Sequence, residues 1–282
     1  MPKHDALRAI FILMVSFDRF ADSCRRIRKD SPVIHNITNF VAMNFSANVL
    51  LAIGASPLMS SEPDEIEEID SLASSLVINL GCLDSGQIRA MYIAASTMHS
   101  LGKPWVLDPV GAGISRLRSR TAEELISRYR PTVIRGNASE IMSLCGIKAR
   151  THGIDSAEDS LYASQYAVQL ARDCGSIISI SGETDIITDG GSIVRIYNGD
   201  RLMPSVTAMG CSASAVTAAF LAVGENPLQD ATFAMALMGT AGERAAGSCA
   251  GTGSLAVKIL DELSSTEPEV LAQSIRHGQE SA

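Results

Sequence analysis

Short apolar runs recur along the chain, and each ends in or just before a glycine or a polar residue. An amphipathic segment of helical length follows most of them. The runs are 75–80, 105–107, 132–134 and 177–180, and the helical segments are 85–100, 121–129, 139–145 and 155–174. This alternation is typical of βαβ units. The pattern therefore predicts an α/β fold with three layers, α/β/α, in which a central, mainly parallel sheet is flanked by helices.

Two later stretches depart from this alternation. In residues 185–203, β-branched residues alternate around Asp-Gly-Gly and Asn-Gly-Asp, which are strong turn signals. We expect antiparallel hairpin strands there, at one edge of the sheet. Segment 227–246, which is rich in alanine and methionine, and segment 252–263 are predicted to be helices that pack in the core.

The chain has the organisation of a single domain. No Pro/Gly/Ser-rich linker, low-complexity tract or internal repeat divides its 282 residues. We predict one domain over 31–282, preceded by an N-terminal helix or extension over 1–30. The apolar run 9–15 is at the short limit for a signal peptide and lacks a cleavage site. No run approaches the length of about 20 residues that crosses a membrane, so a cytoplasmic location is expected.

Composition narrows the range of partners. Hydrophobic residues make up 46% of the chain and charged residues 19%, which indicates a compact globular protein. The formal net charge of −8 gives no electrostatic support to a nucleic-acid or anionic-membrane partner. The six cysteines form no Cys-x-x-Cys pair and share no ligand spacing with the histidines, which favours a reducing compartment over a disulfide framework or a zinc site.

The segment 204–220, PSVTAMGCSASAVTAAF, is the strongest local signal. A turn of small residues that includes Ala208, Gly210 and Cys211 opens into an apolar helix. The free N–H groups of a first helical turn bind phosphate oxygens, and small residues allow a ligand to approach the backbone. If Cys211 is exposed at this helix start, its pKa is expected to be lowered. The alternative is an ordinary helix cap followed by a tight contact between helices.

Two further motifs follow predicted strands. In VLDPVGAG, Asp108 ends a strand and is suited to Mg²⁺ binding through water, or else is a turn aspartate. The glycines do not form a dinucleotide fingerprint, and no Walker motif is present. In VIRGNASEI, Asn137 and Glu140 have the spacing of a capping box. That spacing leaves Arg135 unexplained, and an arginine at a strand end is a good clamp for phosphate.

Two weaker signals remain. Ser181, in ISISGETD, is a small polar turn residue that either contacts a nucleotide or lies in an exposed turn. A polar cluster follows a predicted strand at 32–34 and consists of His35, Asn36, Thr38 and Asn39. Such a cluster either caps the next helix or holds a polar ligand. Met59, taken alone, is more often a core residue than a ligand contact.

These segments, in this order, resemble hydroxyethylthiazole kinase of the ribokinase-like superfamily. The resemblance is carried by HNITNFVAMNFSANVLLAIGASPLM, LDPVGAG and RGNASEI, and it spans about 31 to 253. It implies ATP-dependent phosphorylation of the hydroxyl of 4-methyl-5-(2-hydroxyethyl)thiazole in thiamine biosynthesis, with Mg²⁺ as cofactor. It further implies a homotrimer whose thiazole sites lie at subunit interfaces.

The resemblance also implies roles for individual residues. It places Met59, Asn36 and Ala208 at the substrate, Arg135, Ser181 and Gly210 at the nucleotide, Asp108 and Glu140 at magnesium, and Cys211 beside the acceptor hydroxyl as a weak base. One departure concerns Ala208, which stands where the family has a glycine and would be strained if the position needs a positive φ.

Three other functions remain open. The first two are a hydroxymethylpyrimidine kinase and an ADP-dependent dehydratase of hydrated nicotinamide nucleotides, both with the same fold. The third is a nucleotide sensor without turnover. The polar segment from His35, Met59 and the cysteine at 211 argue against the dehydratase, and the intact set of Asp108, Arg135, Glu140 and Cys211 argues against the sensor.

Overall fold

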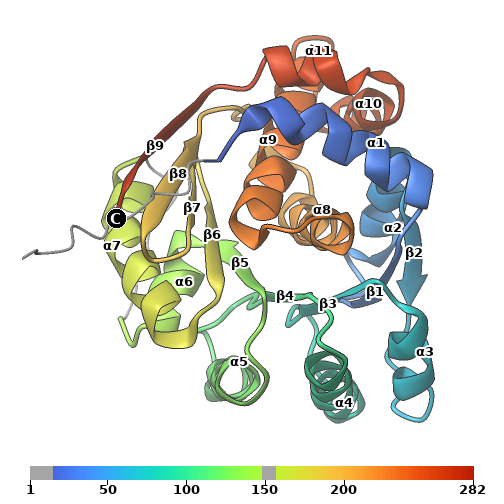
Figure 1. Ribbon diagram of the computed structural model, residues 1–282, viewed down its shortest axis with the longest axis vertical. Helices are drawn as coiled ribbons and strands as arrows, with labels where there is room; N and C mark the ends of the chain where they lie inside the picture. The colour runs from blue at the N-terminus through green and yellow to red at the C-terminus, as the bar shows by residue number, and fades with distance from the viewer. Residues whose placement is uncertain (1–14, 148–156) are drawn as a thin grey trace, which may run out of the picture.

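The computed structural model describes residues 15–147 and 157–282 and shows one twisted sheet between two layers of helices (Figure 1). Within these residues the sheet has nine strands in the order β2-β1-β3-β4-β5-β6-β7-β8-β9. Neighbouring strands from β2 to β6 are parallel, and the pairs from β6 to β9 are antiparallel. The strands are β1 Val33–Ile37, β2 Ser56–Met59, β3 Ser75–Asn79, β4 Trp105–Asp108, β5 Val133–Asn137, β6 Ile177–Ser181, β7 Asp185–Thr188, β8 Ser192–Ile196 and β9 His277–Ser281.

Helices cover both faces of the sheet, and α8 and α9 lie directly on one of them (Figure 1). On that face are α1 Phe20–Asp30, α2 Met43–Ile53, α8 Met209–Val223, α9 Pro227–Ala246, α10 Thr252–Ser265 and α11 Pro268–Gln273. On the other are α3 Ile66–Leu72, α4 Ser85–Leu101, α5 Arg116–Tyr129, α6 Ala138–Leu144 and α7 Ala157–Cys174. The predicted three-layer α/β/α fold is therefore confirmed.

Each central strand supplies both apolar cores, because successive side chains of a strand point to opposite faces. Val133 joins the core under α8 and α9, and the next residue, Ile134, joins the core under α4 to α7. Val77 and Ile78 of β3 divide in the same way. A sheet covered on both faces explains why the strands read as continuous apolar runs in the sequence.

Several strands run further than the sequence predicts. β5 continues through Arg135 to Asn137, and β1 continues through His35 and Asn36 to Ile37. Both strands lie inside the sheet and pair with neighbours on two sides, so ladder hydrogen bonds hold their polar residues in extended backbone. The expected boundaries at 134 and 34 are wrong for this reason.

The predicted hairpin is present as β7 and β8, joined by the turn at Asp189 to Gly191. Residues 197–203 are not part of it. The hairpin is also not the edge of the sheet, because β9 pairs with β8 outside it. Its five residues, His277–Ser281, are mostly polar and carried no strand signal in the sequence.

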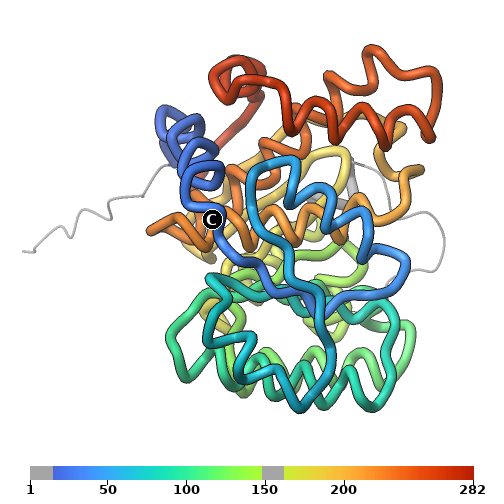
Figure 2. The backbone as a smooth tube through the Cα atoms, turned by 90° about the vertical axis from the view of Figure 1, so that its right-hand side faces the viewer, coloured from blue at the N-terminus to red at the C-terminus, as the bar shows by residue number. Residues whose placement is uncertain are grey.

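The N-terminal segment is fastened to the last strand. The backbone of Val15 makes two hydrogen bonds with the Gln279 side chain, and Phe17 stacks on His277. From there α1 crosses to α8 and α11, so the first and last helices lie side by side (Figure 2). The apolar run at 9–15 lies outside the described residues except for Val15.

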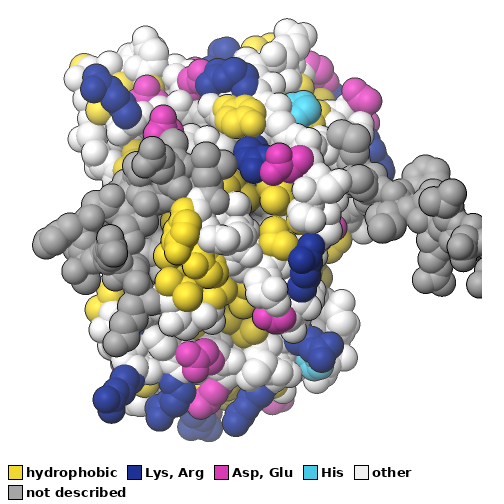
Figure 3. All heavy atoms as spheres, turned by 90° about the vertical axis from the view of Figure 1, so that its left-hand side faces the viewer, with side chains coloured by type: hydrophobic (Ala, Val, Ile, Leu, Met, Phe, Trp, Pro, Cys, Tyr) yellow, Lys and Arg dark blue, Asp and Glu magenta, His cyan; other side chains and the backbone are white. Residues whose placement is uncertain are grey.

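No helix among the described residues is long and apolar enough to cross a membrane. On the face that carries α7 and β9, Lys and Arg side chains lie among Asp and Glu (Figure 3). Charges of both signs are therefore interspersed on this face.

Candidate functional site

The carboxyl ends of β3, β4 and β5 meet the first turn of α8. Asn79 and Asp108 are partners in the β3–β4 ladder, and each is the last residue of its strand. α8 begins at Met209 and packs on both strands, which brings Cys211 over them. Residues far apart in the sequence therefore share one rim of the sheet, where ligands of open α/β sheets bind.

Asp108 is buried in a network of neutral donors. Its Oδ2 accepts hydrogen bonds from Asn79 Nδ2 at 2.7 Å and from Ser214 Oγ at 2.8 Å, which leaves Oδ1 for a ligand. Burial raises the pKa of Asp108 to about 6, since a charged carboxylate loses hydration there. Arg135 lowers this pKa in part, and Glu140 raises it.

Cys211 receives two side-chain amides. Asn79 Nδ2 lies 3.2 Å and Asn39 Nδ2 3.6 Å from its Sγ, and Asn39 also donates to Asn79 Oδ1. Burial, with a smaller contribution from Asp108, raises the pKa of Cys211 to about 11. A lowered pKa was expected only for an exposed thiol; this thiol is half-buried, so the condition is not met and the pKa moves in the opposite direction.

Arg135 lies beneath the start of α8. Its side chain is buried, and its Nε has no hydrogen-bond partner among the described residues. A Cβ added to Gly210 would lie 2.7 Å from Arg135 Nη1, so only glycine lets the guanidinium approach the helix start. A buried guanidinium N–H without a hydrogen-bond partner is costly, and an anion in this place would satisfy it.

A second carboxylate, Asp185, faces Arg135 from β7. It is buried, and burial raises its pKa to about 7, while the Gly182 N–H and Arg135 lower it. The Gly182 N–H donates to Asp185 Oδ1 at 3.1 Å. The positive charge of Arg135 therefore lowers the pKa of two buried carboxylates, Asp108 and Asp185, in part against the effect of burial.

Glu140 links the loop at Gly111, which follows β4, to the end of β5. Its Oε1 accepts the Gly111 N–H and its Oε2 accepts the Asn137 N–H, each at 2.9 Å. The second contact completes the predicted capping box. Each oxygen keeps a further lone pair, and Asp108 keeps its Oδ1, so the pair suits a Mg²⁺ ion held through water. The described residues contain no group of three or more His, Cys, Asp or Glu arranged to hold a metal directly.

The remaining predicted residues lie around this cluster. Asn36 and Met59 are partners at the end of the β1–β2 ladder, but the Asn36 amide donates to the Ile34 carbonyl at 2.8 Å. Asn39, rather than Asn36, is thus the asparagine against Cys211. Ser181 ends β6 opposite Asn137 of β5 and is half-buried.

Four polar residues of the rim were not among the site residues expected from the sequence, namely Asn39, Asn79, Ser214 and Asp185. Asn79 shows the recognisable signal, because it closes an apolar strand directly before Leu80-Gly81, just as Asp108 closes the next one. Ser214 had no such signal. It lies in the apolar helix α8, and only the packing of α8 on β4 turns it toward Asp108.

Ala208 precedes α8 with left-handed backbone, φ 67° and ψ 4°. An L-residue with a Cβ is disfavoured in this conformation by about 1 to 2 kcal/mol. The position therefore does need a positive φ, and the condition under which alanine was expected to be strained is met.

Replacing Ala208 with glycine is expected to raise the free energy of unfolding by about 1 kcal/mol, because glycine adopts positive φ without steric cost. Urea denaturation at equilibrium measures the change. Ala222→Gly in the same helix is the matched control and is expected to lower stability by about 1 kcal/mol. A destabilised Ala208→Gly variant would contradict the strain.

Comparison with protein-family models matches residues 24–269 to the hydroxyethylthiazole kinase family. The chain is 48% identical over 242 residues to the hydroxyethylthiazole kinase of Brachyspira hyodysenteriae, covering 86% of this chain and 91% of that protein. It is 44% identical over 262 residues to the hydroxyethylthiazole kinase of Desulfotalea psychrophila, covering 93% and 96%.

Solved structures agree with these sequence matches. The structure of hydroxyethylthiazole kinase from Pyrococcus horikoshii has a TM-score of 0.86 and 38% identity, with 93% of this chain and 99% of that chain covered. A ribokinase-like superfamily protein from Enterococcus faecalis has a TM-score of 0.64, covers 92% and 95%, and is 17% identical. The second likeness concerns the fold alone.

Proposed function

The chain belongs to the hydroxyethylthiazole kinase family, and we propose that it transfers the γ-phosphate of ATP to the hydroxyl of 4-methyl-5-(2-hydroxyethyl)thiazole at the rim that Asp108, Arg135 and Cys211 form. The reaction serves thiamine biosynthesis or salvage. The ribokinase-like fold positions these groups at the carboxyl edge of its sheet.

The proposal is carried by the environment of Arg135. Its guanidinium is buried beneath the N-terminus of α8, and its Nε has no hydrogen-bond partner among the described residues. The free N–H groups of Gly210 and Cys211 begin that helix and add the positive end of its dipole. Phosphoryl transfer proceeds through a loose transition state, so catalysis consists mainly of positioning and neutralising charge. Arg135 and this helix start would do both for the phosphate chain.

Asp108 and Glu140 would hold Mg²⁺ through water, and the ion would neutralise the nucleotide phosphates when bound. The chain's own contribution is to fix the two carboxylates. Asn79 and Ser214 orient Asp108, and two backbone N–H groups orient Glu140. Ser181, at the end of β6, would contact the nucleotide, and Asn36, Met59 and Ala208 would line the acceptor pocket.

Cys211 lies beside the acceptor hydroxyl in this arrangement. A thiol with a pKa of about 11 is protonated at neutral pH, so Cys211 is not a thiolate before the reaction begins. The two amides of Asn39 and Asn79 can only donate to its sulfur, which favours the transient thiolate over the thiol. Cys211 is therefore a weak base whose contribution is small.

Replacing Cys211 with alanine is expected to lower kcat by about tenfold and leave both KM values unchanged, since a loose transition state demands little of a base. In the wild type, kcat is expected to stay flat between pH 7 and 9, because the thiol titrates higher. Steady-state kinetics with the thiazole alcohol measure both. Cys174→Ala on α7 is the control, and complete loss of activity in a folded Cys211→Ala protein would contradict the weak-base role.

We also propose a cytoplasmic homotrimer with sites at subunit interfaces. Three apolar side chains near the β2 edge support this assembly because they are exposed, namely Phe40 at 71%, Val41 at 64% and Leu51 at 60%. The six cysteines are all free, as in a reducing compartment. Residues 31–282 would form the kinase domain, with α1 packed on it. Sedimentation equilibrium tests the trimer.

Incubation of the purified protein with Mg²⁺, a panel of acceptors and either ATP or ADP tests the function. The panel contains the thiazole alcohol, hydroxymethylpyrimidine and a hydrated nicotinamide nucleotide, and ³¹P NMR identifies any phosphate monoester. Phosphorylation of the thiazole alcohol at the highest kcat/KM is expected. Preference for the pyrimidine, dehydration of the nucleotide, or binding without turnover would each replace the proposal with the corresponding alternative.

A further inference from the structure

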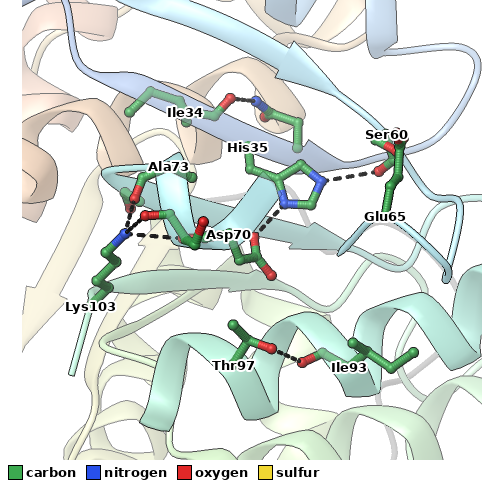
Figure 4. Close-up of polar contacts among 12 residues, drawn as sticks. Ile34, His35, Ser60, Glu65, Asp70, Ala73, Ile93, Thr97 and Lys103 are labelled. Atoms are coloured by element: carbon green, nitrogen blue, oxygen red, sulfur yellow. Dashed lines mark hydrogen bonds and ion pairs between the residues drawn. The ribbon is translucent and has the colours of Figure 1, made fainter. Parts of the chain in front are cut away.

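A buried histidine–aspartate pair lies on the face of β1 that α3 covers. His35 Nδ1 and Asp70 Oδ1 are 2.7 Å apart, and both side chains are completely buried. The other ring nitrogen, Nε2, lies 3.2 Å from the carbonyl oxygen of Ser60. Figure 4 shows the ring between the carboxylate and this carbonyl; His35 lies on β1, Asp70 on α3 and Ser60 directly after β2.

The partners of His35 determine where its hydrogens lie. A carbonyl oxygen only accepts hydrogen bonds, so Nε2 must carry a hydrogen to bond Ser60. One proton lies between Nδ1 and the Asp70 carboxylate, whichever atom holds it. Asp70 therefore fixes both the orientation of the ring and its Nε2–H donor, as a carboxylate does for many functional histidines.

Ser60 is the first residue after Met59, at the open edge of the sheet. β2 has only four residues, all half-buried, and pairs with β1 on one side only. The last residue of β2 in this ladder is Met59, which pairs with Asn36 of β1. The Ser60 hydroxyl bonds Glu65, which is exposed. His35 is thus the buried anchor that holds the chain where it leaves the strand.

Stability does not explain the pair. Removing a charged or polar pair from water costs about as much as its attraction returns. Asp70 Oδ2 has no hydrogen-bond partner among the described residues. Lys103 donates to the Asp70 carbonyl and to two neighbouring carbonyls, but not to the carboxylate (Figure 4). What the pair contributes is the directed contact at Ser60.

We propose that His35 and Asp70 are positioning residues that hold Ser60, and through it Met59, in the acceptor pocket. The inference rests on the proposed function, in which Met59 contacts the thiazole alcohol. Their loss would weaken binding of the alcohol without weakening binding of ATP, because the nucleotide groups at Arg135 and Gly210 lie on other elements.

Two substitutions at His35 separate its two contacts. In His35→Gln the amide N–H stands near the place of Nε2–H and keeps the bond to Ser60. In His35→Asn the shorter side chain keeps the contact with Asp70 and loses Ser60. We expect His35→Asn to raise the KM for the thiazole alcohol about three- to tenfold, the effect of one hydrogen bond, while the KM for ATP and kcat stay within about twofold. His35→Gln is expected to restore the wild-type KM.

Hydrogen–deuterium exchange of the peptide that covers 60–65 gives a readout independent of activity. Its amides are expected to exchange faster in His35→Asn than in His35→Gln. Glu67→Gln, at an exposed position of α3, is the control with wild-type values. If His35→Asn does not fold, Asp70→Leu replaces it, with the same expected rise in KM.

The outcomes separate this inference from the proposed function. A wild-type protein without thiazole kinase activity overturns the proposed function, and exchange at 60–65 then decides alone whether His35 holds the segment. Equal exchange and equal KM in the two His35 variants overturn the inference. A rise in the KM for ATP as large as that for the alcohol also overturns it, because it shows general destabilisation.

Discussion

Replacing Arg135 with alanine is expected to raise the KM for ATP about a hundredfold and to leave the KM for the thiazole alcohol within about twofold. The guanidinium is buried and lacks a partner at Nε, so its bonds to phosphate would form without competition from water. Truncating one member of such a charge pair costs about 2 to 5 kcal/mol. Initial rates with each substrate varied in turn measure the two constants.

Two further variants make the Arg135 result specific. Arg135→Lys keeps the positive charge but loses the planar guanidinium that can bind two phosphate oxygens at once. A rise of about tenfold in the KM for ATP is expected. Arg195→Ala removes an arginine whose partner is Glu280 at the sheet edge, and wild-type constants are expected. Equal increases in both KM values for Arg135→Ala would count against a nucleotide clamp.

The second large effect is expected from Asp108→Asn. Asparagine keeps the shape and can accept the bonds from Asn79 and Ser214, but it removes the negative charge that would orient Mg²⁺. We expect kcat to fall about a thousandfold, in the range found for loss of one transition-state charge contact. A coupled assay for ADP release measures it. Asp84→Asn, a helix cap at an exposed turn, is the matched control.

The same substitution is expected to stabilise the protein above pH 6. The pKa of Asp108 in the folded state, about 6, lies above its ordinary value of 3.8 because of burial. Between these values the folded chain holds a proton that the unfolded chain has released, so the free energy of unfolding falls as pH rises. The loss is of the order of 3 kcal/mol and is complete above pH 6. Asparagine avoids it, so Asp108→Asn should unfold at higher urea than the wild type at pH 8. Lower stability at pH 8 would contradict this account.

A more stable but inactive Asp108→Asn protein would show that the carboxylate is retained for chemistry. Functional sites commonly carry such costs, since the groups that catalyse are unfavourable to bury. The wild type is also expected to lose kcat/KM below about pH 6, as Asp108 takes up a proton.

The sequence alone determined the architecture and most of the rim. The alternation of apolar runs with amphipathic segments specified a mainly parallel sheet, because a strand covered on both faces must be apolar throughout. Asp108 and Arg135 were identifiable because each directly follows an apolar run, and Cys211 because it lies in a turn of small residues that opens an apolar helix. The capping box at Asn137 and Glu140 was identifiable because its spacing is local.

Which polar groups meet depends on how the elements pack against one another. Asn39 and Asn79 converge on Cys211 from different elements, and no local pattern specifies a contact between residues 132 positions apart. The edge strand β9 was missed because its pairing with β8, and not its composition, makes it extended. The direction of the Cys211 pKa likewise depended on burial, which the sequence does not state. Composition and spacing thus specify elements and candidate groups, whereas contact and burial arise only when the chain is packed.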